Sequence, residues 1–263
     1  MTTYVIKIGG HALIDLSTES AALATFAQDI VALTSEGAHV VVIHGGGPTI
    51  ASLLELVGEP STFVDGLRVT TPSVMQYVDM ALAHVNRELV SRLCQHGVPA
   101  VGVSGVDGAT LTAQAVGGPL QRVATQPRVD VTLIKHLWSG GFIPVVSPVA
   151  NDDTWQRVNC NADTAAGAIA GALNADALLL LSDIDQVRSD VADSSSGLRS
   201  VTVAEIAALM ASGAAQDGMR PKLQAAVDAI EAGAQRVWLA NGTREHCVRD
   251  LLAHQLPTTE ILP

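Results

Sequence analysis

Three lysines stand out in this sequence because the chain otherwise uses arginine for positive charge. Only Lys7, Lys135 and Lys222 are lysines among 15 lysine and arginine residues. Lys7 ends an apolar segment two residues before Gly9-Gly10, and Lys222 begins an amphipathic segment. A lysine ammonium is a compact charge on a flexible stem, which suits contact with phosphate or carboxylate oxygens. Lys135 lies within an amphipathic segment, and we interpret it as a solvated surface charge.

Two glycine-rich turns indicate where an anion could bind. Gly9-Gly10 and Gly45-Gly46-Gly47 each follow a short apolar segment and precede a predicted helix. Backbone N–H groups at such turns bind anions without any side chain, and glycine allows the ligand to approach closely. Neither turn has the spacing of a Walker A loop or of a dinucleotide fingerprint, so a purely structural tight turn is the alternative. The neighbouring Lys7 favours phosphate binding.

Two further clusters combine polar groups that could hold a substrate. The segment 159–164 (Asn-Cys-Asn-Ala-Asp-Thr) opens an alanine-rich helix, where Asn161 or Asp163 could simply cap the helix. Arg68 follows the glycine turn at Gly66 and could clamp a carboxylate through two parallel hydrogen bonds. Alone, an arginine at such a place is an ordinary surface residue.

The remaining candidates are weaker. Asp183 and Asp185 follow a predicted strand, and they either frame a nucleotide or merely end the strand. His11 and His44 flank the glycine turns and could contact phosphate. The chain has 8 histidines, but none has the spacing of metal ligands, so no metal site is predicted.

Short apolar runs alternate with amphipathic stretches along the whole chain, and this order predicts the scaffold that positions these residues. Apolar runs predict strands at 4–6, 40–43, 100–103, 143–146, 177–181 and 237–239. The intervening helical periodicity includes a long helix over 73–96. The predicted fold class is α/β, a three-layer αβα sandwich with a mostly parallel central sheet. We expect a single domain with an N-terminal lobe of about 1–150 and a C-terminal lobe of about 151–263.

Composition limits the class of partner. The formal net charge is −11, which argues against a nucleic-acid or anionic-membrane partner. No membrane span or signal peptide is apparent, and Cys94, Cys160 and Cys247 are too widely spaced for a disulfide framework. These features predict a cytoplasmic protein, and we interpret the three cysteines as core residues.

Eight short motifs occur in an order that resembles the amino acid kinase family. They are KIGG (7–10), HGGGP (44–48), GLRVT (66–70), VNRELV (85–90), SGVDG (104–108), NCNAD (159–163), LSD (181–183) and DGMRPK (217–222). The GLRVT and NCNAD motifs are particularly similar to the acetylglutamate kinase branch of that family. The resemblance covers nearly the whole chain and implies the family's fold.

The resemblance also implies a role for each matching residue. Lys7 and Lys222 would neutralise charge on the transferring phosphoryl group, and Asp163 would hold both lysines in place. The residues implied to bind substrate are Gly45, Gly46, Arg68 and Asn159. The residues implied to bind the nucleotide are Gly9, Gly10, Asp183, Asp185, Gln216 and Met219. Val106 and Gln186 depart from the family pattern, which has lysine and glycine there.

The implied reaction is ATP-dependent phosphorylation of the side-chain carboxylate of N-acetyl-L-glutamate in arginine biosynthesis. Mg²⁺ would accompany ATP, held mostly by phosphates and water. Because no extra helix precedes Lys7, the resemblance implies an arginine-insensitive homodimer built on the 73–96 helix. Two alternatives stay open: a kinase acting on aminoadipate or glutamate attached to an amino-group carrier protein, and a non-catalytic nucleotide or amino-acid sensor on the same fold.

Overall fold

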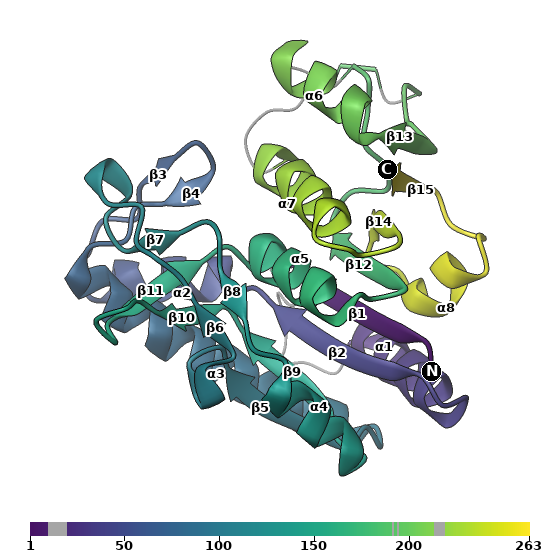
Figure 1. The fold of residues 1–263 in the computed structure, drawn as a ribbon, viewed down its shortest axis with the longest axis horizontal. Coiled ribbons are helices and arrows are strands. Elements are labelled where there is room, and N and C mark those ends of the chain that lie inside the picture. Colours follow the sequence, from purple (N-terminus) through teal and green to yellow (C-terminus); the bar gives the residue numbers. More distant parts are fainter. Residues whose placement is uncertain (10–19, 191, 194, 213–218) are drawn as a thin grey trace.

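The centre of the molecule is an eight-stranded sheet (Figure 1). The computed structural model describes residues 1–9, 20–190, 192–193, 195–212 and 219–263. In spatial order the strands of this sheet are β13 (Ser200–Thr202), β15 (Thr258–Leu262), β14 (Val237–Asn241), β12 (Ala177–Ser182), β1 (Thr3–Ile8), β2 (His39–His44), β9 (Ile143–Ser147) and β5 (Ala100–Ser104). All neighbouring pairs are parallel except β14 with β15.

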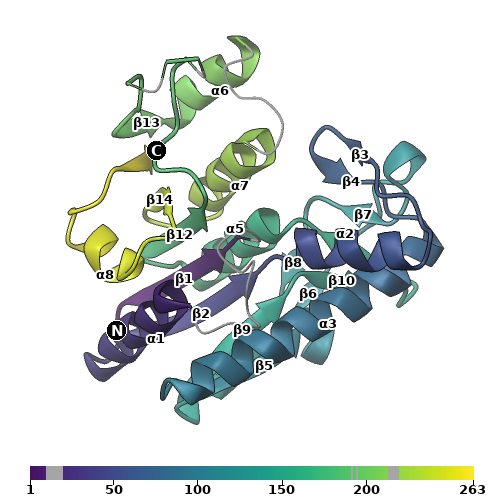
Figure 2. The ribbon, with the colours of Figure 1, turned by 180° about the vertical axis from the view of Figure 1, so that it is seen from behind.

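Helices cover both faces of this sheet, as Figures 1 and 2 show from opposite sides. One face packs against α1 (Ala21–Ser35), α3 (Pro72–Gln95) and α8 (Cys247–Leu252). The other packs against α4 (Thr132–Ser139), α5 (Ala162–Leu173), α6 (Val203–Ser212) and α7 (Met219–Glu231). The helix α2 (Gly47–Leu56) packs on α3. The predicted three-layer αβα sandwich with a mostly parallel sheet is confirmed.

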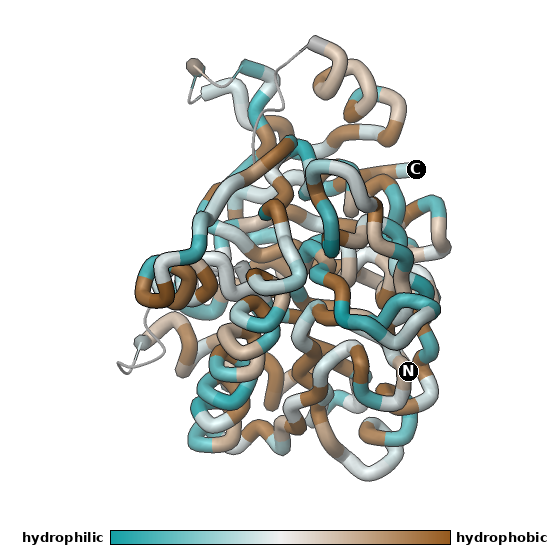
Figure 3. The backbone as a smooth tube through the Cα atoms, turned by 90° about the vertical axis from the view of Figure 1, so that its left-hand side faces the viewer, coloured by the Kyte–Doolittle hydropathy of each residue, from teal (hydrophilic) through white to brown (hydrophobic). Residues whose placement is uncertain are grey.

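The apolar runs in the sequence are continuous because both faces of the central strands are buried. Val5 and Val41 belong to the core on the side of α5, whereas Ile6 and Val42 belong to the core on the side of α1. Successive side chains of a strand point to opposite faces, so a sheet covered on both sides needs apolar residues at every position. Figure 3 shows these hydrophobic stretches running through the interior of the chain trace.

A second, smaller sheet and a hairpin lie beside the carboxyl ends of the central strands (Figure 1). The smaller sheet consists, in spatial order, of β7 (Val123–Ala124), β11 (Arg157–Cys160), β10 (Val149–Asn151), β6 (Leu111–Thr112) and β8 (Arg128–Val129). Short 3₁₀ turns occur at Asp107–Ala109 and Gly118–Leu120. The hairpin joins β3 (Phe63–Val64) to β4 (Leu67–Arg68) through Asp65 and Gly66, both at positive φ. The sequence predicts this turn-rich hairpin.

Three features differ from the sequence analysis or were missed by it. Cys94 lies exposed on α3, so its assignment to the core is wrong, whereas Cys160 and Cys247 are buried. The strand β15 was not predicted, and it reverses the direction of the sheet at β14. The helix α6 was also not predicted.

None of the helices in the described ranges combines the length and hydropathy that crossing a bilayer requires.

The helices α5 and α7 pack closely because α5 carries glycine at the contact. A Cβ added at Gly167 would lie 2.7 Å from the carbonyl oxygen of Ala225, and a Cβ at Gly171 would overlap Ala232. Distances this short do not occur for real side chains without backbone movement. The two glycines therefore set how closely α5 and the second half of α7 approach each other.

We expect Gly167→Ala to destabilise the protein by about 1–3 kcal/mol, a usual cost of overpacking a core. Gly→Ala within a helix normally stabilises by about 1 kcal/mol, so the expected effect has the opposite sign from helix propensity. Urea unfolding followed by circular dichroism measures the change. A variant as stable as the wild type would show that the contact between α5 and α7 is not close-packed.

Candidate active site

The predicted substrate and phosphoryl-transfer residues meet at the carboxyl ends of the central strands. They line a cavity of 270 Å³ whose walls include Lys7, Gly45, Gly46, Arg68, Asn159 and Asp163. In open parallel sheets, ligands bind in the crevice outside this edge. The strand order places β1 between β2, which the chain reaches through α1 on one face, and β12, which it reaches through α5 on the other face, and such a reversal is where the crevice opens.

A buried carboxylate in the wall of this cavity holds two lysines, of which Lys7 also lines the cavity. Lys7 Nζ lies 2.9 Å from Asp163 Oδ1, and Lys222 Nζ donates a hydrogen bond to Oδ2 at 3.0 Å. Lys7, Asp163 and Lys222 expose 5%, 5% and 9% of their surface. These residues come from β1, α5 and α7, so the arrangement forms only when three separate elements meet. We call this group the lysine–aspartate–lysine triad.

The local structure of α5 explains why Asp163 is available for this role. Asn161 caps the helix: its side-chain oxygen accepts from the N–H groups of Asp163 and Thr164 at 2.8 and 3.3 Å. The alternative that one of these polar residues simply caps the helix is therefore correct for Asn161. Asp163 lies in the first turn, where the helix dipole favours a negative charge.

The electrostatics of the triad favour ionised groups. Burial alone would raise the pKa of Asp163, but the two neighbouring ammonium groups outweigh burial and hold this pKa at about 2. Burial lowers the pKa of Lys7, opposed by Asp163 and reinforced by Lys222. Two positive charges and one negative charge leave one net positive charge facing the cavity, which suits an anionic group.

The glycine turns bring backbone to the cavity without side chains in the way. A Cβ at Gly9 would lie 3.0 Å from Leu181 O and 3.3 Å from Lys7 Nζ. A Cβ at Gly46 would lie 2.9 Å from the Leu82 side chain. Gly45 N donates to Ile8 O at 3.2 Å, which ties the second turn to the end of β1. The predicted residue Gly10 lies outside the described residues.

Arg68 lies in the cavity wall rather than on the surface. It is 8% exposed, and its guanidinium donates to Ser61 Oγ and, at 3.2 Å, to Gly47 O. The guanidinium also lies 4.7 Å from the centre of the Phe63 ring. Burial lowers the pKa of Arg68. These contacts fix the guanidinium beside the glycine turn, and they exclude the surface alternative considered for this residue.

One polar group in the cavity wall was predicted, and a second polar group, beside Gly9, was not. The predicted residue Asn159 donates to Thr70 Oγ1 at 3.0 Å. Ser182, at the end of β12, was missed: it is 6% exposed, and its Oγ has no hydrogen-bond partner among the described residues. The signal was present in the LSD motif, whose serine ends a buried strand next to Gly9.

Of the residues implied to bind the nucleotide, Asp183, Asp185 and Met219 do not line the cavity. Asp183 is exposed after β12. Asp185 Oδ1 accepts from Arg244 Nη2 at 2.8 Å and from Asn241 Nδ2 at 3.2 Å. Met219 begins α7, while the predicted residue Gln216 lies outside the described residues. The structure therefore gathers one set of predicted residues in the cavity and places these others beside β12 and α7.

The departure at Gln186 has a structural explanation. Its side-chain amide donates to Leu198 O at 3.3 Å and to Thr258 O at 3.0 Å. A Cβ on Gly197 would overlap the Gln186 side chain. Gln186 therefore ties the segment after β12 to the segment that precedes β13 and to the first residue of β15.

Two further expectations are settled by burial. His44 does not contact the cavity, because its side chain is 0% exposed and bonds to Asn86 and Gly45, so the prediction that it contacts phosphate is wrong. His11 lies outside the described residues. Lys135 is exposed on α4, as predicted. No cluster of three or more metal-ligating side chains occurs in the described part of the chain.

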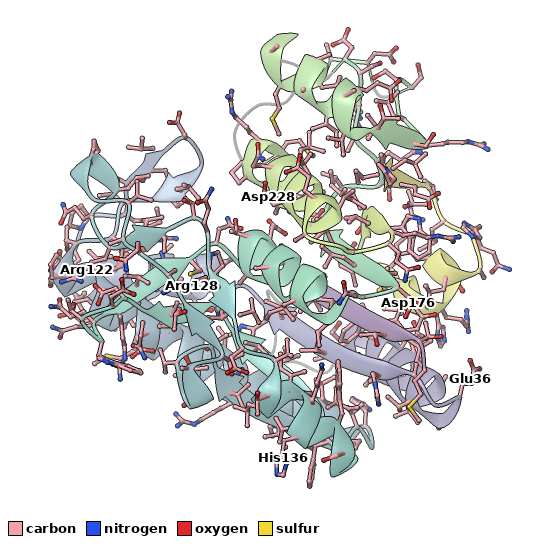
Figure 4. All side chains as sticks on the ribbon, in the orientation of Figure 1. Glu36, Arg122, Arg128, His136, Asp176 and Asp228 are labelled. Atoms are coloured by element: carbon pink, nitrogen blue, oxygen red, sulfur yellow. The ribbon has the colours of Figure 1, made fainter. Side chains whose placement is uncertain are left out.

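Other arginines near the site are already paired. Figure 4 labels Arg122 and Arg128, both on the part of the molecule that carries the smaller sheet. Arg122 lies 3.1 Å from Asp152, and Arg128 lies 3.3 Å from Asp153. Neither lines the cavity that contains the triad. Among the described residues, the cations that line the cavity are Lys7 and Arg68, and Lys222 is joined to it through Asp163.

The fold and the site define an α/β protein that holds anionic groups between buried lysines and glycine turns at one edge of a parallel sheet. The chain belongs to the amino acid kinase family, whose sequence model matches residues 2–241. The resemblance inferred from the motifs is confirmed.

Individual relatives agree with this assignment. Acetylglutamate kinase of Symbiobacterium thermophilum is 39% identical over 254 residues, covering 93% of this chain and 85% of the relative. Acetylglutamate kinase of Corynebacterium jeikeium is 42% identical over 252 residues, covering 93% and 78%.

Solved structures show the same fold. The protein smu.665 of Streptococcus mutans has a TM-score of 0.81 at 27% identity, with 91% of this chain and 94% of that chain covered. Carbamate kinase of Giardia lamblia bound to AMP-PNP has a TM-score of 0.70 at 19% identity, with 99% and 98% covered. The likeness to carbamate kinase concerns the fold alone.

The depressed pKa of Asp163 gives a testable pH dependence. Because the folded-state pKa is about 2 and the ordinary value is 3.8, ionised Asp163 stabilises the fold above about pH 4. This contribution, on the order of 2 kcal/mol, is lost as the pH falls towards 2. Between pH 5 and pH 2, we expect the unfolding free energy of the wild type to fall by about 2 kcal/mol more than that of Asp163→Asn. A denaturant unfolding series at each pH measures this difference.

The matched control is Asp153→Asn, which removes an exposed carboxylate paired with Arg128. This control should keep the pH dependence of the wild type, because exposed ion pairs contribute little. Equal pH dependence in the wild type and Asp163→Asn would contradict the assigned ionisation of the triad.

Proposed function

We propose that this chain is an ATP-dependent kinase that phosphorylates the side-chain carboxylate of N-acetyl-L-glutamate, giving N-acetyl-L-glutamyl 5-phosphate in arginine biosynthesis. The observation that carries this proposal is the triad of Lys7, Asp163 and Lys222, two of whose members, Lys7 and Asp163, line a cavity with Arg68 and the second glycine turn. The names of the relatives, which are 39% and 42% identical, support the same substrate.

The proposed reaction needs charge stabilisation more than proton transfer. A carboxylate oxygen of the substrate attacks the γ-phosphorus of ATP, the bond from phosphorus to the β,γ-bridging oxygen breaks, and ADP leaves. The attacking carboxylate is already ionised, so no general base is required. Two anions must approach each other, and the net positive charge of the triad offsets their repulsion. Phosphoryl transfer depends mainly on such positioning and electrostatic stabilisation.

The cavity walls supply separate groups for the substrate. Arg68 is the proposed partner of a carboxylate of the substrate, because its guanidinium is held beside Gly47 and the residue lines the cavity. Asn159, on β11 of the smaller sheet, is the proposed partner of the substrate's acetylamino group. Gly45 and Gly46 provide backbone groups between them.

The nucleotide is proposed to lie along the ends of β12 and α7. The buried Ser182 hydroxyl needs an acceptor, which a phosphate oxygen beside Gly9 would supply. Asp183, Asp185 and Met219 lie along the same path, and Gly10 and Gln216 are proposed to contribute as well. Mg²⁺ would be held by phosphate oxygens and water.

The coarser organisation follows from these placements. We propose that residues 1–150 form the substrate lobe and residues 151–263 the ATP lobe of one domain, working in the cytoplasm. A homodimer through α3 is supported by Met80, which is 59% exposed on that helix, and by β5, which forms an edge of the central sheet.

Hydroxylamine trapping tests the proposed reaction, because hydroxylamine converts an acyl phosphate into a stable hydroxamate. With ATP and Mg²⁺, we expect hydroxamate and ADP from N-acetyl-L-glutamate, and neither from free glutamate, aspartate or aminoadipate. An inert protein under these conditions would contradict the proposed substrate. Product only after addition of an amino-group carrier protein loaded with aminoadipate or glutamate would favour the carrier-bound alternative. Binding of ATP without product from any acceptor would favour a sensor.

A further inference from the structure

His44 occupies a position that the proposed mechanism does not use. It is the last residue of β2, directly before the second glycine turn, and its side chain is 0% exposed. Its Nδ1 lies 2.9 Å from Gly45 O, and its Nε2 lies 3.0 Å from Asn86 Nδ2 on α3. Both ring nitrogens are therefore satisfied inside the protein.

The surroundings of Asn86 fix the position of the proton on the His44 ring. Asn86 Nδ2 also lies 2.9 Å from Val145 O, and a carbonyl oxygen can only accept. The Asn86 atom that faces both groups must therefore be the nitrogen, and it donates to both. His44 Nε2 is then the acceptor, so the ring proton is on Nδ1 and is donated to Gly45 O.

Burial keeps the ring in this neutral form. The pKa of His44 is lowered to about 4, mainly by burial and against the opposing hydrogen bond to Gly45. A second ring proton on Nε2 would face the N–H of Asn86. Gly102 on β5 leaves room for the Asn86 amide, since a Cβ there would overlap Asn86 Oδ1.

The hydrogen bond to Gly45 O determines the direction of the next N–H group. The Gly45 carbonyl and the Gly46 N–H belong to one planar trans peptide and point in opposite directions. The carbonyl points to the buried His44, so the Gly46 N–H points away from the core. Gly46 lines the cavity, and its N–H has no hydrogen-bond partner among the described residues.

The two flanking residues leave this peptide free to rotate unless it is held. Gly45 and Gly46 both lack a Cβ, so a peptide flip between them meets little steric resistance. A flipped peptide would direct the Gly45 carbonyl oxygen towards the cavity. That oxygen would repel the carboxylate and phosphoryl oxygens that the proposed reaction brings there.

We propose that His44 is a positioning residue that prevents the Gly45–Gly46 peptide from flipping and so aims the Gly46 N–H at the reacting anions. The kinetic consequence rests on the proposed function. The orientation of the peptide is independent of the proposed function, because it follows from the contacts of His44, Asn86 and Val145.

Two substitutions separate positioning from packing. The amide nitrogen of asparagine can take the place of Nδ1, so His44→Asn keeps a donor to Gly45 O and loses the partner of Asn86. The longer glutamine side chain places its amide near the position of Nε2, so His44→Gln keeps a partner for Asn86 and loses the donor to Gly45. Each variant retains one of the two hydrogen bonds, and we expect similar losses of thermal stability.

We expect kcat with N-acetyl-L-glutamate to fall about 10- to 100-fold in His44→Gln, part of what losing an oriented backbone donor costs. We expect His44→Asn to stay within about 3-fold of the wild type, with KM for ATP little changed in both. Equal losses of kcat in the two variants, or losses that match the unfolded fraction, would overturn the proposal.

Two measurements do not depend on activity. Nitrogen-15 NMR of the wild type should show the His44 proton on Nδ1, and a proton on Nε2 would overturn the proposal even if neither variant folds. Crystal structures should show the Gly45 carbonyl rotated towards the cavity in His44→Gln and in its original direction in His44→Asn. If the NMR and crystallographic results are as expected but the wild type is catalytically inactive, the proposed function is contradicted and the positioning of the peptide by His44 is not.

Discussion

The ion pairs between Asp163 and two lysines are the constraint on which the rest of the site depends. All three side chains are buried, and burying a charge is costly unless a partner compensates it. Lys7 comes from β1, Asp163 from α5 and Lys222 from α7, so each element must end at the same place. The close contact of α5 and α7 at Gly167 brings Lys222 to Asp163, 59 residues away in the chain.

This constraint reconciles an acidic chain with anionic ligands. The formal net charge is −11, so the protein as a whole repels anions at long range. The cavity overcomes this with a few buried cations and with backbone N–H groups, which carry no compensating negative charge. Groups held in place before the reaction need no reorganisation when charge develops on the phosphoryl group. We propose that the fixed hydrogen bonds of Arg68 and His44 serve the same purpose around the second glycine turn.

The sequence allowed Lys7 and the glycine turn at 45–47 to be placed at strand ends, because each directly follows an apolar run. Asp163 was placed at the start of a helix, because polar residues precede an alanine-rich run there. The predictions that failed concern features that depend on contacts between distant segments. A histidine beside a glycine turn resembles a phosphate ligand, and only the packing of α3 shows that His44 faces Asn86 instead. Likewise, the pattern of α3 does not reveal that Cys94 is exposed, and a short final strand such as β15 has too few residues to show its direction.

The most direct test of the triad's role is the single-turnover rate of phosphoryl transfer in Lys7→Arg, with Lys135→Arg as the matched control on exposed α4. Arginine keeps the charge but replaces the compact ammonium, which lies close to Gly9 and Asp163, with a larger planar group. The account predicts that Lys7→Arg folds normally, binds AMP-PNP within about 10-fold of the wild type and loses about 100-fold or more in transfer rate, because the lost contact acts in the transition state. Near-normal transfer by Lys7→Arg, or a loss equalled by Lys135→Arg, would contradict it.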